Sequence, residues 1–135
     1  MIVRVDRARI AALPFFAGLP EQELDAVAGA AGEVEFTAGE SLTAEGQFGH
    51  GLYFIEEGTA DVSTNGTKIG AVEPGDVVGE VAVLASGRRT ASVVATSPVR
   101  AVSLFKREVW ALEQKAPEAA RRLRAALDAR QDESS

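Results

Sequence analysis

Residues 75–93 read GDVVGEVAVLASGRRTASV, and this stretch decides how the whole chain is interpreted. Glu80 to Leu84 are predicted to form one helical turn, with the small residues Gly79 and Ala82 near its N-terminal end. Backbone N–H groups are unpaired at the start of a helix, and the helix dipole favours negative charge there. Small side chains let an anion approach these N–H groups, so the stretch predicts a site for a small anion.

Three side chains in the same stretch indicate what kind of anion would bind there. Arg89 offers a fork of donors suited to phosphate oxygens, and Thr90 adds a hydroxyl beside it. Glu80 is unusual next to a phosphate, because two negative charges repel each other. A carboxylate is useful there if the ligand also carries hydroxyl donors, as a ribose does. Arginine and glutamate together therefore indicate a nucleoside monophosphate.

Strand-like patterns lie on both sides of this stretch. Polar and apolar residues alternate over 33–36, 59–63 and 91–96, whereas 52–55 and 99–105 are more continuously apolar. The continuous runs predict strands that are covered on both faces. Turn glycines recur about every 7–12 residues, which is typical of short strands in a sandwich or small barrel. The fold class predicted is mainly β, a jelly-roll-like β-barrel flanked by N-terminal and C-terminal helices.

Helical patterns precede the strands. Asp6 is predicted to cap a short turn that Pro14 ends. Pro20 is predicted to open a second helix, and Gly29 and Gly32 to end it. Among the turns, Asn65-Gly66 is a strong tight-turn signal.

Helical patterns also follow the strands. Two helices are expected, with a break near Ala116-Pro117. Trp110 could cover a purine, but packing against the barrel is the preferred interpretation, as is docking for Leu123, Ala126 and Leu127. A solvated face is expected for Arg121, Arg122 and Arg124.

The chain is predicted to be one domain over residues 1–135. Its parts are N-terminal helices over 1–31, the β-barrel over 32–105 with the ligand segment over 79–93, and C-terminal helices over 106–131. The composition is that of an ordinary globular protein, with 46% hydrophobic and 25% charged residues.

The charge distribution excludes several classes of partner. The net charge is −6, and the sequence between Ile10 and Gly87 contains thirteen acidic residues but one cationic residue, Lys68. Such a surface repels DNA and anionic lipids, so neither nucleic acid nor a membrane is expected as a partner. No apolar run approaches a membrane span, and the N-terminus lacks the apolar core of a signal peptide, so a cytoplasmic location is expected.

The residue inventory argues against catalysis. The chain has no cysteine and one histidine, His50, so neither thiolate chemistry nor a metal site is expected. A nucleotide enzyme such as a phosphodiesterase is disfavoured, because scattered acidic residues do not make a two-metal site. No catalytic residue is assigned.

The ligand segment resembles a known family. The motif Gly79-Glu80-x-Ala82-x-Leu84, with Arg89 five positions further on and followed by Thr90-Ala91-Ser92-Val93, is similar to the phosphate-binding cassette of cyclic nucleotide-binding domains. That family includes bacterial catabolite activator proteins and regulatory subunits of cyclic-AMP-dependent kinase. Around the cassette, Thr37-Ala38-Gly39-Glu40 matches a turn in the first hairpin. The similarity covers residues 7–128.

The resemblance implies a cyclic nucleotide, cyclic AMP or cyclic GMP, as a regulatory ligand. Arg89 would pair with the phosphate oxygens, Glu80 would accept the ribose 2′-hydroxyl, and Thr90 would reach a phosphate oxygen or the purine. The implied ligand residues are Gly79, Glu80, Val81, Ala82, Arg88, Arg89, Thr90 and Ala91. Two positions depart from the family: Val78 stands where phenylalanine is frequent, and Arg88 where proline is frequent.

The function that follows is a sensor module that binds a cyclic purine nucleotide, with cyclic AMP as the preferred ligand, and repositions its C-terminal helices. These helices would signal to a partner protein, a second copy or an attached domain. About thirty residues follow the barrel, enough for two helices but not for a helix-turn-helix module as well. The alternative is a degenerate domain of the same fold that binds a protein and no nucleotide.

Overall fold

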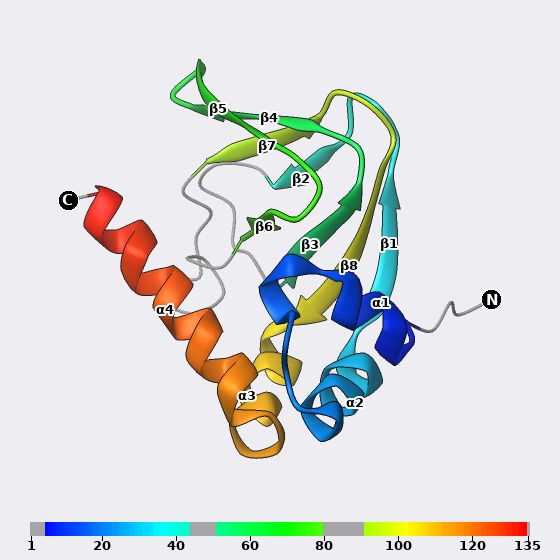
Figure 1. The fold of residues 1–135 in the computed structure, drawn as a ribbon. Helices are drawn as coiled ribbons and strands as arrows, with labels where there is room; N and C mark the ends of the chain where they lie inside the picture. The colour runs from blue at the N-terminus through cyan, green and yellow to red at the C-terminus, as the bar shows by residue number, and fades with distance from the viewer. Residues whose placement is uncertain (1–4, 44–50, 80–90, 135) are drawn as a thin grey trace.

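The computed structural model describes residues 5–43, 51–79 and 91–134, and all structural statements below refer to them. Two four-stranded sheets, each antiparallel throughout, are stacked in the molecule (Figure 1). Sheet A has the order β1 (Gly32–Phe36), β8 (Val99–Phe105), β3 (Gly51–Glu57), β6 (Val77–Val78), and sheet B the order β2 (Ser41–Thr43), β7 (Ser92–Ala95), β4 (Ala60–Thr64), β5 (Thr67–Val72). The predicted fold class, mainly β with flanking helices, is confirmed.

Sheet A is the middle layer of the molecule. On β3, Leu52 and Phe54 pack toward the helices, whereas the next residue, Ile55, packs toward sheet B. On β8, Leu104 faces the helices and Ala101 faces sheet B in the same way. Successive side chains of a strand point to opposite faces, so each of these strands contributes to two cores. This confirms the prediction that both runs are covered on both faces.

In the described part of the chain, four α-helices and one 3₁₀ turn lie on the outer side of sheet A, mostly below the sheet in Figure 1, where α4 continues up the left side. They are α1 (Arg7–Ala12), the 3₁₀ turn η1 (Pro14–Phe16), α2 (Glu21–Ala30), α3 (Lys106–Lys115) and α4 (Pro117–Ser134). The predicted cap is present, because the Asp6 carboxylate accepts a hydrogen bond from the backbone N–H of Arg9 at 2.9 Å. α1 ends before Pro14, as expected.

Of the two glycines predicted to end the second helix, Gly32 lies just beyond its end, whereas Gly29 does not end it. Gly29 lies inside α2, which continues to Ala30 and is closed by a hydrogen bond from the N–H of Ala31 to the carbonyl of Val27. Val27 is fully buried, so tertiary packing holds this last turn despite the weak helix propensity of glycine. Gly32 starts β1 directly afterwards.

The C-terminal helices break between Lys115 and Pro117, as predicted, but the position of Trp110 was predicted wrongly. Trp110 is 59% exposed, because Val109 and Leu112 carry the buried face of α3 and Trp110 is turned about 100° away from Val109. Leu123 docks in the helical core and is 1% exposed. The side chains of Ala126 and Leu127 lie outside the described residues.

The turn at Asn65-Gly66 and the turn at residues 37–40 connect different kinds of strand pairs. Asn65 and Gly66 both adopt positive φ, at 52° and 78°, and close the β4–β5 hairpin as their sequence predicts. The turn at 37–40 is not a hairpin, which corrects the expectation. β1 pairs with β8 in sheet A and β2 with β7 in sheet B, so this turn carries the chain from one sheet to the other.

Candidate functional site

The structure describes both ends of the predicted ligand segment. Gly79 directly follows β6, which is an edge strand of sheet A, and Ala91 directly precedes β7 in sheet B. The segment therefore leaves one sheet and enters the other. The remaining predicted ligand residues lie outside the described residues: Glu80, Val81, Ala82, Arg88, Arg89 and Thr90.

At the first end, the backbone leading to Gly79 is fastened to β3. Val78 pairs with Tyr53, and Val77 with Phe54. Gly79 has φ +98°, a conformation that L side chains rarely adopt. Glycine is thus required at this position by the backbone, in addition to the close approach that an anion would need.

The turn before β6 is also held by β3. The N–H of Gly75 donates to the carbonyl of Ile55 at 2.8 Å, and the N–H of Ile55 donates to the carbonyl of Asp76 at 3.0 Å. A carboxylate oxygen of Asp76 accepts from the N–H of Glu73 at 2.8 Å, which closes the turn. The entry to the ligand segment is therefore built on a central strand of sheet A.

At the second end, a buried threonine holds the backbone. The Oγ1 of Thr43 donates to the carbonyl of Ala91 at 3.0 Å, and Thr43 is 6% exposed. Sequence reasoning missed Thr43, because a single threonine in a three-residue strand carries no periodic or spacing signal.

Below both ends lies the core between the sheets. Val78 is 5% exposed and belongs to the same buried cluster as Leu42 and Val93. Tyr53 packs at the margin of this cluster, with its ring edge-to-face on Phe36 at a centroid distance of 5.5 Å. The two ends of the ligand segment therefore share one apolar support.

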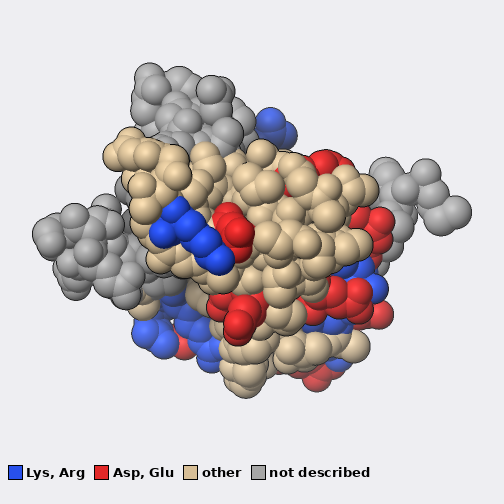
Figure 2. Space-filling view, turned by 90° about the horizontal axis from the view of Figure 1, so that it is seen from above, with Lys and Arg blue, Asp and Glu red and all other residues tan. Residues whose placement is uncertain are grey.

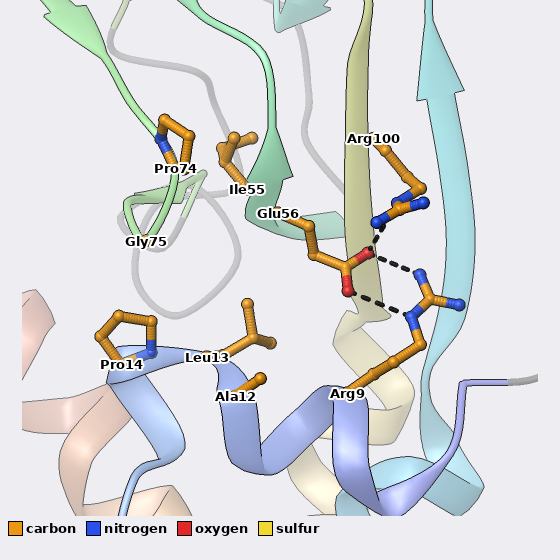
Figure 3. Close-up of a pocket in the computed structure, with 9 residues that line it drawn as sticks. All are labelled: Arg9, Ala12, Leu13, Pro14, Ile55, Glu56, Pro74, Gly75 and Arg100. Atoms are coloured by element: carbon orange, nitrogen blue, oxygen red, sulfur yellow. Dashed lines mark hydrogen bonds and ion pairs between the residues drawn. The ribbon is translucent and has the colours of Figure 1, made fainter.

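A separate cavity of about 380 Å³ lies between α1, η1 and β3 (Figure 3). Arg9, Glu56 and Arg100 lie together at one end of it, and Pro14 and Pro74 lie on opposite walls at the other end. Ala12, Leu13, Ile55 and Gly75 complete the lining.

The charged end of this cavity is an ion-pair cluster. Arg9 binds both carboxylate oxygens of Glu56, at 3.0 and 2.5 Å, and contacts Glu33 at 2.8 Å. The hydrogen bond with Glu56 raises the pKa of the Arg9 guanidinium above its ordinary value, against the opposing effect of partial burial. Arg100 contacts Glu56 at 3.5 Å and Glu57 at 2.9 Å.

A β-bulge explains how two neighbouring glutamates reach one arginine. The register between β3 and β8 shifts between Ile55 and Glu57, and Glu57 is the Cα partner of Arg100. Because both oxygens of Glu56 are engaged by Arg9, this cluster joins α1 to sheet A rather than presenting a free acid or base.

Three hydrogen bonds anchor α4 to the N-terminal part of the chain. Arg122 donates to the carbonyl oxygens of Phe15 at 3.0 Å and Ala17 at 2.8 Å. The buried carboxylate of Glu23 accepts from the N–H of Ala119 at 3.0 Å. Arg122 therefore departs from the predicted solvated face, whereas Arg121 and Arg124 are exposed as expected.

The described surface offers no broad basic face in the view from above. Figure 2 shows a face whose described part is mostly uncharged, with a basic and an acidic group side by side near its centre and further charged side chains of both signs along its right and lower margins. Within the described ranges, no group of three or more His, Cys, Asp or Glu side chains could hold a metal ion. No helix in those ranges is long and apolar enough to span a bilayer.

Comparison with known proteins assigns the family. The family model for the cyclic nucleotide-binding domain matches residues 33–116, which include the predicted ligand segment. The chain belongs to the cyclic nucleotide-binding domain family. The resemblance seen in the sequence is thus confirmed.

Three relatives illustrate the membership. The cAMP-dependent protein kinase regulatory subunit of Aspergillus niger is 32% identical over 82% of this chain, which spans 28% of that protein's length. The catabolite activator protein of Thermus thermophilus is 28% identical, with a TM-score of 0.79 over 90% of this chain and 59% of that one. The regulatory subunit of a cAMP-independent protein kinase A from Trypanosoma cruzi, bound to guanosine, is 31% identical, with a TM-score of 0.75 over 91% of this chain and 46% of that one.

Proposed function

We propose that this chain is a regulatory, non-catalytic module that binds cyclic AMP or cyclic GMP and signals through its C-terminal helices. The spacing from Gly79-Glu80 to Arg89-Thr90 carries the proposal, because it matches the family's phosphate-binding cassette without a gap. Its support in the structure is the position of this segment between β6 and β7.

The proposed ligand contacts are those that the resemblance to the family's cassette implies, and the chemistry of the residues suits them. Arg89 pairs with the phosphate oxygens, which a guanidinium can bind through two parallel hydrogen bonds. Glu80 accepts the ribose 2′-hydroxyl. Backbone N–H groups at Gly79 and Ala82 add to the anion site. The flanking ligand residues are Val81, Arg88, Thr90 and Ala91.

The output passes through α4. A ligand shifts a conformational equilibrium only by the difference in its affinity for the two conformations. In the structure α4 is fastened to η1 by Arg122 and to α2 by Glu23. A nucleotide that favours another position of α4 therefore acts against these contacts, and the moved helix signals to a partner, a second copy or an attached domain in the cytoplasm.

A nucleoside is the second candidate ligand. The Trypanosoma cruzi relative holds guanosine, at 31% identity to this chain. A nucleoside carries the ribose hydroxyls but no phosphate, so it would use Glu80 and leave Arg89 without its anion. The two candidates therefore make opposite predictions about Arg89.

Calorimetric titration with cyclic AMP, cyclic GMP and guanosine tests the proposal. Saturable binding of either cyclic nucleotide is expected, together with a rise in melting temperature, because a ligand that binds only the folded chain stabilises it. Cyclic AMP recovered unchanged after incubation is the expected sign that the chain does not hydrolyse it. Binding of guanosine alone favours the second candidate, and no heat with any ligand at millimolar concentration contradicts both.

A further inference from the structure

Thr43 lies at the end of the short edge strand β2, next to the chain that leaves the ligand segment. β2 pairs with β7 through a register shift, so that Ser41 is opposite Val94 and Thr43 is opposite Val93. The Thr43 hydroxyl donates to the carbonyl of Ala91, beyond that last pair. Ala91 precedes Val93 by two positions, so the Thr43 side chain extends the contacts of β2 by two residues toward the ligand segment.

The chain at this point is held from both sides. Ser92 pairs with Ser63 on β4, which is the other neighbour of β7 in sheet B. On the β2 side, the hydroxyl of Thr43 holds the carbonyl of the preceding residue, Ala91. Because Thr43 is 6% exposed, water competes little for this bond.

A hydroxyl is not needed for packing at this position. Valine has nearly the shape of threonine and would fill the same space, so the polar bond to Ala91 is the feature that distinguishes the native residue. A buried hydroxyl normally has a hydrogen-bond partner, and here that partner is one of the predicted ligand residues.

We infer that Thr43 is a positioning residue for the nucleotide site. By fixing the backbone of Ala91, it holds the end of the segment in which Arg89 and Thr90 bind phosphate. The inference rests on the proposed function, and it adds a side chain from a different strand to the residues on which ligand affinity depends.

Two variants separate positioning from packing. Thr43→Val removes the hydroxyl and keeps the volume, whereas Thr43→Ser keeps the hydroxyl and loses one methyl group. Loss of one hydrogen bond corresponds to about a three- to tenfold loss of cyclic AMP affinity for Thr43→Val. Thr43→Ser is expected to bind within about twofold of the native chain, since the positioning bond remains.

Adenosine serves as the ligand without a phosphate. If the hydroxyl acts by placing the phosphate-binding groups, Thr43→Val weakens cyclic AMP binding and leaves adenosine binding unchanged. Amide hydrogen exchange in the ligand-free protein gives a second readout, in which Thr43→Val accelerates exchange at Ala91 and Ser92 but not in β8.

Each outcome is decisive. Native cyclic AMP affinity in Thr43→Val, or equal losses in Thr43→Val and Thr43→Ser, overturns the inference, as does an equal loss for adenosine. A native chain that binds no cyclic nucleotide removes the proposed function and the ligand role of Thr43 with it. The exchange rates then still show, independently of any ligand, whether the hydroxyl holds Ala91.

Discussion

The carboxylate of Glu23 accepts a hydrogen bond from the backbone N–H of Ala119 at 3.0 Å, across 96 positions of the chain. Ala119 is in the first turn of α4, where backbone N–H groups lack partners within the helix. The dipole of α4 also favours a negative charge at this end. Glu23 therefore caps the C-terminal helix from α2, and couples the stability of the two helices.

Removal of this cap is expected to destabilise the protein. Glu23→Ala leaves a buried N–H unsatisfied and opens a small void, at a cost of about 2 kcal/mol in the free energy of unfolding. Glu23→Gln keeps an oxygen acceptor and should lose less. Urea denaturation measures both. Glu21→Ala is the matched control, because Glu21 is 72% exposed and its pair with Arg7 contributes less than about 1 kcal/mol. Equal stability of Glu23→Ala and Glu21→Ala would contradict the capping role.

Gly58 is predicted to be the least replaceable of the described turn glycines. A Cβ at this position would lie 2.2 Å from the carbonyl oxygen of Pro98 and 2.8 Å from the Cα of Val99, and φ is +95°. Strain and overlap together should cost Gly58→Ala about 3–4 kcal/mol of unfolding free energy. Gly39 has a similar φ of +93° and no atom within 4 Å of a built Cβ, so Gly39→Ala isolates the strain, at about 1–2 kcal/mol. A thermal melt of both variants checks the difference.

Strands could be predicted from the sequence where they were long enough to show a recognisable pattern of apolar residues. β3 and β8 each have 7 residues, and their apolar side chains alternate between two cores, so apolar residues stand next to one another along much of each strand. β2 and β6 have 3 and 2 residues, too few to show a period of two. Their pairing depends on β7 and β3, which lie far away in the sequence.

The sequence yields a prediction of the candidate site only where residue chemistry and spacing coincide. Glycine, glutamate, arginine and threonine at fixed intervals indicate a ligand within one short segment. Thr43 and Glu23 act on partners 48 and 96 positions away, so their roles follow from tertiary structure. Arg122 shows the same limit, because helical periodicity cannot reveal that its guanidinium donates to the carbonyl oxygens of Phe15 and Ala17.

Protonation of Glu118 should lower the stability of the folded chain at acidic pH. Hydrogen bonds from Arg121, above all, and from Arg122 lower the pKa of Glu118 to about 2. The folded chain thus binds this proton less readily than the unfolded chain. The stabilisation is complete above the ordinary pKa of 4.5 and is lost as the pH falls from there toward 2. Carboxyl-detected NMR should show the midpoint rise in Arg121→Ala.

Glu40 provides the internal control for that titration. The hydroxyl and backbone N–H of Thr37 lower the pKa of Glu40, and neither group contacts Arg121. Its midpoint should therefore be the same in the native chain and in Arg121→Ala. A parallel shift of both carboxyls would indicate a general loss of structure rather than loss of one partner.

Substitution of Arg89 or Glu80 is expected to weaken nucleotide binding. Arg89→Leu removes the cation that pairs with phosphate, and Glu80→Ala removes the acceptor for the ribose hydroxyl. Each should weaken cyclic AMP binding at least about tenfold, which corresponds to about 1.4 kcal/mol, because each takes away a charged partner of the ligand. Lys68→Leu is the control for a lost positive charge, since Lys68 lies on β5, is 61% exposed and pairs with Asp61. Calorimetry on the three variants separates the outcomes. If Lys68→Leu weakens binding as much as Arg89→Leu, the long-range electrostatic field of the protein, and not a direct contact with Arg89, accounts for the loss of affinity. If only Glu80→Ala has an effect, the ligand is held by its sugar, as a nucleoside would be.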